Sequence, residues 1–485
     1  MPLLAAPLCL LTNERRFAWG ISVAASWTAF AIAALLLGQA LDGDIVSYEL
    51  GGWSARWGIE YRVDIVNAFV LLIVSGIGSM VLLYARLSVQ QEIYAGRVPL
   101  FYAVYMLCLG GLLGVAITGD VFNLFVFMEI SSLASYALIA MSEERRALTS
   151  AYQYLIMGTI GATFILIGIG LLYMMTGTLN MQDIAQRLPA VSGNHTVETA
   201  FAFLTVGISI KLALVPLHLW LPNAYAYAPS VVTAFIAATS TKIAFYVLLR
   251  FMYTIFGASF AFQNMPLSII FLVLALVAMF AGSVAAIFQD NLKRMLAYSS
   301  IAQIGYMILG ISLASATGLT AAILHLFNHA LMKSALFLAL GCVYYRLGQV
   351  NMEQLRGLGR SMPWTMAAFV IGGLSLIGVP LTVGFISKWY LVLAALEQGW
   401  WPVAVAILLA SLLAVVYIWR VIEAAYFQAP ADNSDVVARE APLSMLLPTW
   451  ALIIANLYFG IDSSLTTTAA AQAAQCLLKM CGLPQ

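Results

Sequence analysis

Residues 121–141 read VFNLFVFMEISSLASYALIAM, an apolar stretch with a single acidic residue, Glu129, near its middle. A helix of about 20 apolar residues crosses the hydrocarbon core of a bilayer, so this segment is predicted to span a membrane with Glu129 close to the midplane. A charge at that depth costs roughly 2.5–3.5 kcal/mol for Lys or Asp on insertion scales, and groups kept there mark proton or ion pathways. Four lysines lie in other apolar segments in the same way: Lys211, Lys242, Lys333 and Lys388. These five residues predict a membrane protein that moves protons through its own interior.

The composition agrees with a membrane location. Of the 485 residues, 63% are hydrophobic and only 9% are charged, which excludes a soluble globular domain and predicts an all-α, polytopic membrane protein. The net charge of +1 gives no indication of nucleic-acid binding. The sequence contains no glycine-rich phosphate loop, nicotinamide or flavin fingerprint, or iron–sulfur pattern. We therefore expect no cofactor and no redox site in this chain.

Apolar segments long enough to cross a bilayer recur along the whole chain. Together with the short apolar stretch 1–11 they predict about 14 helices, with spans near residues 17–40, 64–86, 98–118, 121–141, 151–176, 199–221, 230–256, 265–288, 294–314, 319–346, 363–397, 401–427 and 444–462. We expect four parts: N-terminal helices in 1–97, a first five-helix repeat in 98–256, a second, inverted five-helix repeat in 265–427, and a C-terminal helix and tail in 428–485.

Two parts of the sequence match each other at a constant offset of 171 residues. The matching segments are 147–181 and 318–352, and the pairs include Thr149 with Thr320, Gly170 with Gly341, Gly177 with Gly348 and Asn180 with Asn351. The offset contains five expected helices, and an odd number of crossings turns the second copy upside down relative to the first. Transporters built from such inverted repeats hold their functional groups near the membrane midplane, between the repeats.

Each expected repeat contains a broken helix. Val-Pro-Leu occurs at 215–217 and again at 379–381, within the segments that carry Lys211 and Lys388. A proline inside a span frees backbone groups that protein or water must then satisfy. Broken helices at corresponding places of two repeats are the best indication of an ion path that a sequence offers.

The basic residues of the connecting segments predict an orientation. One side of the bundle is expected to carry Arg15, Arg16, Arg86, Arg97, Arg145, Arg146, Lys293, Arg294, Arg346, Arg356, Arg360 and Arg439, and the other Arg56, Arg62, Arg187 and Lys479. Cytoplasmic loops carry an excess of Lys and Arg. We therefore expect the first side in the cytoplasm and both termini outside.

Glu129 and Lys211 are expected to form an ion pair. Lys211 is the nearest intramembrane cation along the sequence, and a pair would solve the desolvation problem of both charges. The alternative is a static pair that only fixes helix packing. The other intramembrane lysines lack carboxylate partners, which favours a role in transport.

Lys242 and Lys388 are the expected inner and last stations of a proton relay. A lysine in an apolar place can lose and regain a proton near neutral pH. The alternative for Lys242 is snorkelling of its ammonium group to an interface. Arg250 lies nearer a helix end and is interpreted as such an interface anchor, and Asp64 as an interface or helix-contact residue. Lys388 follows the second break directly, where a proton would leave.

His325, His329 and Lys333 are spaced i, i+4, i+8 and therefore form one stripe on a helix. Histidine titrates near physiological pH and suits a relay. Two alternatives stay open: hydrogen-bonded histidines that only stabilise packing, or a metal held by the two histidines, although no carboxylate or cysteine accompanies them. His218, seven residues after Lys211 and on roughly the same face, is interpreted as a relay or a packing residue.

Five motifs, in this order, resemble the antiporter-like subunits shared by Mrp-type sodium/proton antiporters and complex I. They are GDVFNLFVFME at 119–129, Lys211 followed by PLHLWLP at 216–222, AYSSIAQIGY at 297–306, NHALMK at 328–333, and Val-Pro at 379–380 followed by GFISK at 384–388. The similarity covers nearly the whole chain, and together the motifs are highly specific for the superfamily. The resemblance implies the same architecture of two inverted five-helix repeats.

The resemblance also implies roles for individual residues. It implies that Glu129 and Lys211 form the charge pair. It implies that Lys242 and either His325 or Lys333 form the central relay, and that Lys388 is the terminal lysine. Many relatives have Asp after the Leu-Pro motif and His soon after, where this chain has Asn223 and Tyr225. The resemblance therefore implies no role of that loop in proton entry.

Within the family, the sequence looks most like the D-type chain of Mrp antiporters. The terminal residue is Lys388, whereas complex I subunits of the chain 4 type carry a glutamate there. No long lateral helix is expected after residue 462, unlike in the chain 5 type and the A-type chain of Mrp antiporters. Chain 2 type subunits share the lysine, so the choice rests on the overall sequence, including residues 222–230.

The resemblance implies a subunit of a multisubunit monovalent cation (Na+)/proton antiporter in the bacterial cytoplasmic (inner) membrane. Such a chain works with other subunits of its complex and is a secondary transporter, not an enzyme, with H+ and Na+ as the expected ions. One alternative is a proton-pumping membrane subunit of complex I or a membrane-bound hydrogenase, again without a redox site of its own. Another is a structural membrane subunit whose charge pairs only hold helices together.

Overall fold

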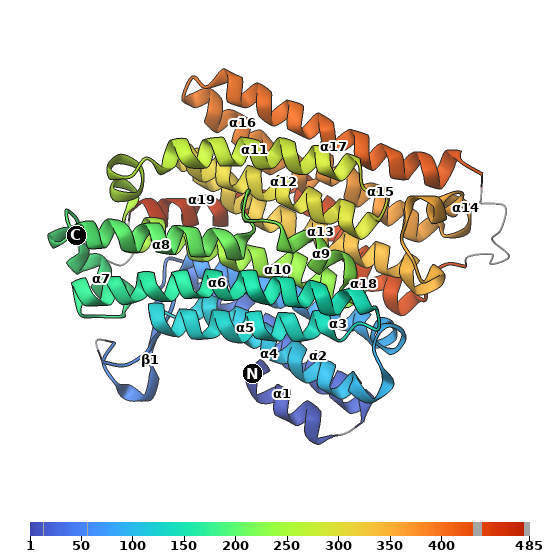
Figure 1. Ribbon diagram of the computed structural model, residues 1–485, viewed down its shortest axis with the longest axis horizontal. Helices are drawn as coiled ribbons and strands as arrows, with labels where there is room; N and C mark the ends of the chain where they lie inside the picture. The colour runs from blue at the N-terminus through green and yellow to red at the C-terminus, as the bar shows by residue number, and fades with distance from the viewer. Residues whose placement is uncertain (13, 56, 430–438, 480–485) are drawn as a thin grey trace.

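The computed structural model describes residues 1–485 except 13, 56, 430–438 and 480–485. In the described part, eleven helices are long and apolar enough to cross a membrane. Most long helices run side by side along the horizontal axis of Figure 1. The predicted all-α membrane fold is confirmed. The other three crossings expected from the sequence correspond to the ten-residue helix α1 (Pro2–Leu11) and to two interrupted helices.

The N-terminal part lies along one flank of the bundle. Helices α1 and α2 (Arg15–Leu41) are at the bottom of Figure 1, and α2 packs on α3 (Ile65–Glu92). Between them, β1 (Val46–Glu49) pairs antiparallel with β2 (Glu60–Val63), where the sequence predicted only a connection. The short 3-10 helices of this part are η1 (Leu50–Gly52) and η2 (Ala95–Arg97).

The order of the elements is similar in the two segments that the sequence predicts to be repeats. The first copy comprises α4 (Val98–Ile117), α5 (Val121–Ala140), α6 (Arg145–Thr176), α7 (Met181–Arg187), η3 (Leu188–Ala190), α8 (His195–Leu212), α9 (Trp220–Tyr227), α10 (Ser230–Leu249) and the π-helix η4 (Arg250–Ile255). After the π-helix η5 (Phe260–Asn264), the second copy comprises α11 (Leu267–Ile287), α12 (Leu292–Ser312), α13 (Ala316–Leu347), η6 (Met352–Leu355), α14 (Leu358–Ser361), α15 (Pro363–Ile377), α16 (Val383–Glu397) and α17 (Trp401–Phe427).

Details of the backbone agree between the two copies at the offset of 171 residues. Helices α6 and α13 begin and end at equivalent positions, and both end at a glycine in the left-handed region, with φ of 68° at Gly177 and 72° at Gly348. An isolated bridge joins Asp120 to Asn180, and the equivalent bridge joins Asn291 to Asn351. The same backbone design is therefore used twice.

Both expected helix breaks are present. The first separates α8 from α9, with Ala213 at φ 61° ending α8, and the second separates α15 from α16 after Gly378, at φ 93°. Gly384 allows the two halves of the second broken helix to touch, because a Cβ there would lie 1.8 Å from the carbonyl oxygen of Ser375. Each break leaves carbonyl groups inside the protein that need hydrogen-bond partners.

The most deeply buried helices lie in the middle of the bundle. α13 packs against α10, α12 and α16, and 100% of its most apolar segment is buried. The buried share of the most apolar segment is 94% for α10, but only 22% for α2 and 39% for α17, which lie on the outside of the bundle. The intramembrane residues Lys242, His325, His329 and Lys333 of α10 and α13 are therefore surrounded by protein and not by lipid.

One C-terminal helix was not predicted from the sequence. α18 (Leu443–Ile461) is the expected last span, but the segment expected as a tail forms α19 (Ser464–Leu478). α19 is rich in Ala, Thr and Gln, so a search for apolar spans does not find it, and it packs against α13 and α3. The last part of the expected tail, 480–485, lies outside the described residues.

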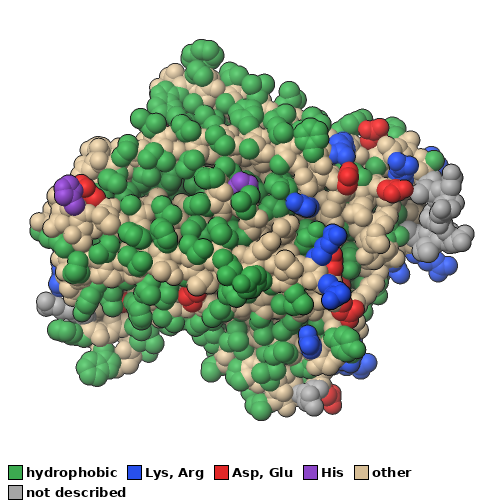
Figure 2. Space-filling view, in the orientation of Figure 1, with side chains coloured by type: hydrophobic (Ala, Val, Ile, Leu, Met, Phe, Trp, Pro, Cys, Tyr) green, Lys and Arg blue, Asp and Glu red, His purple; other side chains and the backbone are tan. Residues whose placement is uncertain are grey.

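Basic side chains concentrate at one end of the bundle. Figure 2 shows Lys and Arg gathered toward the right, over the helix ends near α14 of Figure 1. A cavity of about 1260 Å³ opens at this end, and its charged lining residues are Glu92, Glu144, Arg146, Asp290, Lys293, Arg294, Glu353, Arg356, Arg420 and Glu423. The end that carries these residues is called the basic end below.

Candidate functional site

The first pair of the site joins α5 to α8. Glu129 lies in the middle of α5, and Lys211 is next to the last residue of α8. The Nζ atom of Lys211 lies 2.8 Å from Oε1 of Glu129 and donates a second hydrogen bond, also of 2.8 Å, to the hydroxyl of Ser132. The side chain of Lys211 is 5% exposed and that of Glu129 is 23% exposed. The predicted ion pair is therefore present, with the lysine inside and the carboxylate nearer the surface.

Local features hold Lys211 in this position. α8 approaches α6 so closely that a Cβ on Gly207 would lie 2.7 Å from the carbonyl oxygen of Gly161. Lys211 stands in the last turn of α8, where the helix dipole favours a positive charge. The carbonyl oxygen of Ile210, freed by the break, accepts a hydrogen bond of 3.0 Å from Nε1 of Trp220. This carbonyl therefore has a side-chain partner other than the lysine.

Lys242 lies on α10 and is fully buried. Its Nζ atom donates to the carbonyl oxygen of Ala237 at 2.5 Å and lies 3.4 Å from the hydroxyl of Thr241. The snorkelling alternative is excluded, because no part of the side chain reaches an interface. Within the described part of the chain Lys242 makes no ion pair, so no carboxylate fixes its charge.

The predicted stripe on α13 consists of three fully buried side chains, His325, His329 and Lys333. Lys333 donates to the carbonyl oxygen of Leu296 at 2.8 Å and to the hydroxyl of Ser299. The two imidazole rings are nearly parallel, with centroids 6.1 Å apart. Neither ring nitrogen of His329 bonds to a described residue. The alternative of a histidine held by hydrogen bonds only for packing therefore does not describe His329.

The stripe on α13 lies between Lys242 and Lys388. His325 and Ser387, the neighbour of Lys388, share a hydrogen bond of 2.8 Å between Nδ1 and Oγ. Because α13 packs on both α10 and α16, it connects the two lysines through the protein interior.

Lys388 satisfies the second broken helix. Its Nζ atom donates to the carbonyl oxygens of Leu376 and Ile377, at 2.9 and 2.8 Å, and these are the last two residues of α15. The ammonium group also lies 4.9 Å from the centre of the Tyr306 ring, within the range of a cation–π contact. The carbonyl end of a half-helix favours a cation, so the break forms a binding place for the charged lysine.

His218 is not brought together with the other predicted residues. It lies in the turn between α8 and α9, is partly exposed, and makes no hydrogen bond or ion pair with them among the described residues. The nearby positions that depart from the family pattern are packed against the protein. Nδ2 of Asn223 donates to Oε1 of Gln153 at 3.0 Å, and Tyr225 is buried.

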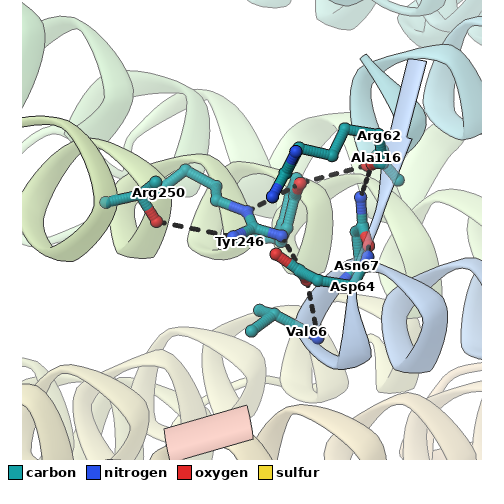
Figure 3. Close-up of polar contacts among 8 residues, drawn as sticks. Arg62, Asp64, Val66, Asn67, Ala116, Tyr246 and Arg250 are labelled. Atoms are coloured by element: carbon teal, nitrogen blue, oxygen red, sulfur yellow. Dashed lines mark hydrogen bonds and ion pairs between the residues drawn. The ribbon is translucent and has the colours of Figure 1, made fainter. Parts of the chain in front are cut away.

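Arg250 is not the interface anchor that its position near a helix end suggested. Its side chain is buried, and its Nη2 atom lies 2.6 Å from Oδ1 of Asp64, which is also buried (Figure 3). A position along a helix does not reveal which face the helix turns to its neighbours. This face of α10 packs against α3, and the interpretation of Arg250 from the sequence is therefore wrong.

The hydroxyl groups beside the buried charges were missed from the sequence. Ser132 bonds to Lys211, Ser299 to Lys333 and Ser387 to His325. A signal was available, because serines recur next to ionisable residues in otherwise apolar spans and buried polar groups need hydrogen-bond partners.

Comparison with known families covers the segment that holds the ion pair, Lys242, the stripe on α13 and Lys388. The family described as NADH:quinone oxidoreductase/Mrp antiporter, TM matches residues 118–414. The chain belongs to this family. The family expected from the sequence motifs is thereby confirmed, and the matched segment begins just before α5 and ends within α17.

Relatives of the chain are found in both branches of the family. It is 42% identical over 461 residues to the N-type chain of the NADH-quinone oxidoreductase of Desulforudis audaxviator, covering 92% of this chain and 90% of the relative. It is 30% identical over 441 residues to the D-type chain of the Na+/H+ antiporter of Alkalihalophilus pseudofirmus, covering 89% and 87%. A chain in the structure of the Mrp complex from Dietzia superposes with a TM-score of 0.90 at 26% identity, covering 98% and 96%.

Proposed function

We propose that this chain is the proton-translocating subunit of a multisubunit monovalent cation/proton antiporter in the bacterial inner membrane. The observation that carries the proposal is the series of buried titratable side chains on helices that pack on one another, from the pair on α5 and α8 through α10 and α13 to α16. Similarity to the D-type chain of an Na+/H+ antiporter and to a chain of an Mrp complex supports it.

The ion pair controls the first proton transfer in this mechanism. While the pair is closed, the carboxylate of Glu129 stabilises the protonated form of Lys211. When the pair opens, Lys211 loses this stabilisation in a buried place and releases its proton more readily toward Lys242. The state of one pair thus sets the direction of the next transfer.

The later steps use groups without fixed counter-charges. Lys242 passes its proton to the stripe of His329, Lys333 and His325 on α13, which packs on α10. The last acceptor is Lys388, whose charged form is stabilised by the carbonyl end of α15. From the second break, α16 leads away from the basic end (Figure 1), so we assign the release of the proton to that side.

The rest of the antiporter lies in other subunits of the complex. Sodium is exchanged elsewhere or at a site shared with a partner chain, since the buried groups of this chain carry protons. The basic end faces the cytoplasm, because an excess of Lys and Arg marks the cytoplasmic side.

The test uses everted vesicles from a sodium-sensitive host that expresses this chain with its neighbouring operon subunits. A pH-sensitive dye follows the lumen after respiration acidifies it, and sodium is then added. Recovery of the dye that depends on sodium and is lost in Lys388→Ala is the expected result. No response to sodium, potassium or lithium from a complex shown to be assembled would refute the antiporter.

A second function is favoured by the 42% identity to the N-type chain of an NADH-quinone oxidoreductase. The same residues would then carry protons, but electron transfer in partner chains would drive the transport. Redox subunits that copurify with this chain, together with proton movement that depends on an electron donor and not on sodium, would identify this second function.

A further inference from the structure

A second buried charge pair lies where α10 passes into the π-helix η4, and it has no part in the relay (Figure 3). Nη2 of Arg250 donates to Oδ1 of Asp64 at 2.6 Å, and Nε donates to the hydroxyl of Tyr246 at 3.0 Å. The third guanidinium nitrogen, Nη1, lies 3.4 Å from the hydroxyl of Thr254. Asp64, Tyr246 and Arg250 are called the arginine cluster below.

Asp64 is held in place by the helix it caps. It is the N-cap of α3, and its Oδ1 accepts hydrogen bonds from the backbone amides of Val66 at 2.9 Å and Asn67 at 3.3 Å, in addition to the arginine. Its own amide donates to Oδ1 of Asn67 at 2.7 Å. Several donors around one carboxylate favour its charged form, so the cluster contains a fixed anion beside a fixed cation.

The members of the arginine cluster are poorly suited to pass a proton on. A guanidinium stays protonated in proteins and offers no acceptor. The hydroxyl of Tyr246 accepts from Arg250, and its own proton is donated to the carbonyl oxygen of Ala116 at 3.0 Å. A relay needs groups that accept a proton on one side and donate it on the other, and these groups have fixed roles.

The arginine cluster lies at the end of α10 that is opposite the basic end. Lys242, Tyr246 and Arg250 follow each other at intervals of four residues and so lie along one stripe of the helix. At the first turn of α10, by contrast, the cavity of the basic end reaches Ala228, whose carbonyl oxygen accepts a hydrogen bond of 3.1 Å from Lys293. One end of α10 therefore meets a charged cavity and the other end meets the arginine cluster.

The second repeat does not carry this arrangement. At the offset of 171 residues, Tyr417 stands at the position equivalent to Tyr246, but Val421 stands at the position equivalent to Arg250. The fixed charge is thus a property of the first repeat and not of the backbone design that both repeats share.

We propose that the arginine cluster blocks proton transfer between Lys242 and the end of the bundle opposite the basic end. The first repeat then exchanges protons only with the basic end and with α13, and a proton on Lys242 leaves through His325 and Lys388. Groups that neither accept nor release a proton interrupt a proton path, and an arginine beside a pore is one of the barriers that exclude protons in membrane channels. The inference rests on the proposed function, because it takes Lys242 as a proton carrier.

The test measures passive proton leak in everted vesicles that contain the assembled complex. Respiration is stopped, no sodium is added, and a pH-sensitive dye follows the collapse of the gradient. In Arg250→Gln we expect the collapse to be several-fold faster than in the wild type, and in the double variant with Lys242→Met we expect wild-type tightness. Arg187→Gln is the matched control, because it removes an ion pair with Asp183 on α7, which packs on η4, and should not leak.

A purely structural role gives a different pattern. A leak that persists in the Lys242→Met background, or an assembled Arg250→Gln complex as tight as the wild type, would overturn the proposal. If Arg250→Gln lowers the amount of complex, Arg250→Lys replaces it in the assay. The lysine keeps a cation beside Asp64 but can release its proton, so the proposal predicts a leak that depends on Lys242. The absence of that leak would overturn the proposal equally. The assay needs no response to sodium, so its outcome is separate from that of the antiport test.

Discussion

The ammonium nitrogen of Lys211 lies 2.8 Å from the carboxylate of Glu129, although 82 positions separate the two residues in the chain. The partners differ in exposure, at 5% for the lysine and 23% for the glutamate. The partly exposed carboxylate is the outer partner of the pair, whereas the lysine is buried and also bonds to Ser132. We infer that movement of Glu129 alone is enough to change the stability of the charge on Lys211.

Replacement of Glu129 by Gln should remove most of the cation-dependent proton exchange. The side chain keeps its size, but the charge that stabilises protonated Lys211 is lost. A hydrogen bond to a charged group contributes about 1.5–3 kcal/mol, and we expect the lower end because Lys211 keeps its hydrogen bond to Ser132. That corresponds to about a tenfold fall in rate, measured as the initial recovery of the dye after sodium is added to everted vesicles.

Ser132→Ala is the matched control for this experiment. It removes a neutral partner of the same lysine, at the same distance of 2.8 Å, and leaves the charge pair intact. We expect a smaller loss than in Glu129→Gln. A normal rate in an assembled Glu129→Gln complex would mean that the pair only fixes the packing of α5 on its neighbours.

Lys388→Gln should stop proton exchange and leave the complex assembled. The amide of the new side chain can still donate to the carbonyl oxygen of Leu376 or Ile377, so the second break keeps a partner, but no transferable proton remains. The expected loss is at least about tenfold. Lys388→Arg keeps the positive charge without a proton to release and should be equally inactive. Exchange that survives in the arginine variant would point to a structural role for the charge.

Ser387→Ala should slow the exchange without stopping it. The substitution removes the hydrogen bond of 2.8 Å to Nδ1 of His325, which holds the ring in one orientation. A neutral hydrogen bond is worth about 0.5–1.5 kcal/mol net, which corresponds to a change of several-fold in rate. His325→Gln should be slower than Ser387→Ala in the same vesicle assay. If Ser387→Ala were slower than His325→Gln, His325 would not be a member of the relay.

The charges of the site were visible in the sequence because each is expensive in its place. An unpaired charge on Glu129 or Lys211 inside a span would carry a large desolvation cost, which an ion pair between them reduces. The pair could therefore be predicted from the sequence, and it is present. The two breaks followed from Pro216 and Pro380, which cannot donate a backbone hydrogen bond. The repeat was visible because glycines and asparagines that end or cap helices, such as Gly177 and Asn180, return at the same offset.

Contacts that depend on tertiary packing were not visible. The partners of Lys242 and Lys333 include the carbonyl oxygens of Ala237 and Leu296, and a backbone carbonyl leaves no mark in the sequence. The burial of Arg250 depends on which face of α10 meets α3. α19 was missed for the same reason, because it packs against α13 and α3 while its own composition of Ala, Thr and Gln is only weakly apolar.

Gly384→Ala should destabilise the protein at the second break. The added Cβ would lie 1.8 Å from the carbonyl oxygen of Ser375, and a backbone atom cannot turn aside as a flexible side chain can. α16 would therefore have to move away from α15 and take Lys388 with it, at a cost of about 1–3 kcal/mol or more for overpacking. Gly170→Ala on α6 is the control, because nothing lies within 4 Å of that position and alanine favours a helix by about 0.5–1 kcal/mol. We expect the amount of assembled complex and its thermal midpoint to fall in Gly384→Ala alone, and equal midpoints in the two variants would mean that the close approach of α15 and α16 is not required.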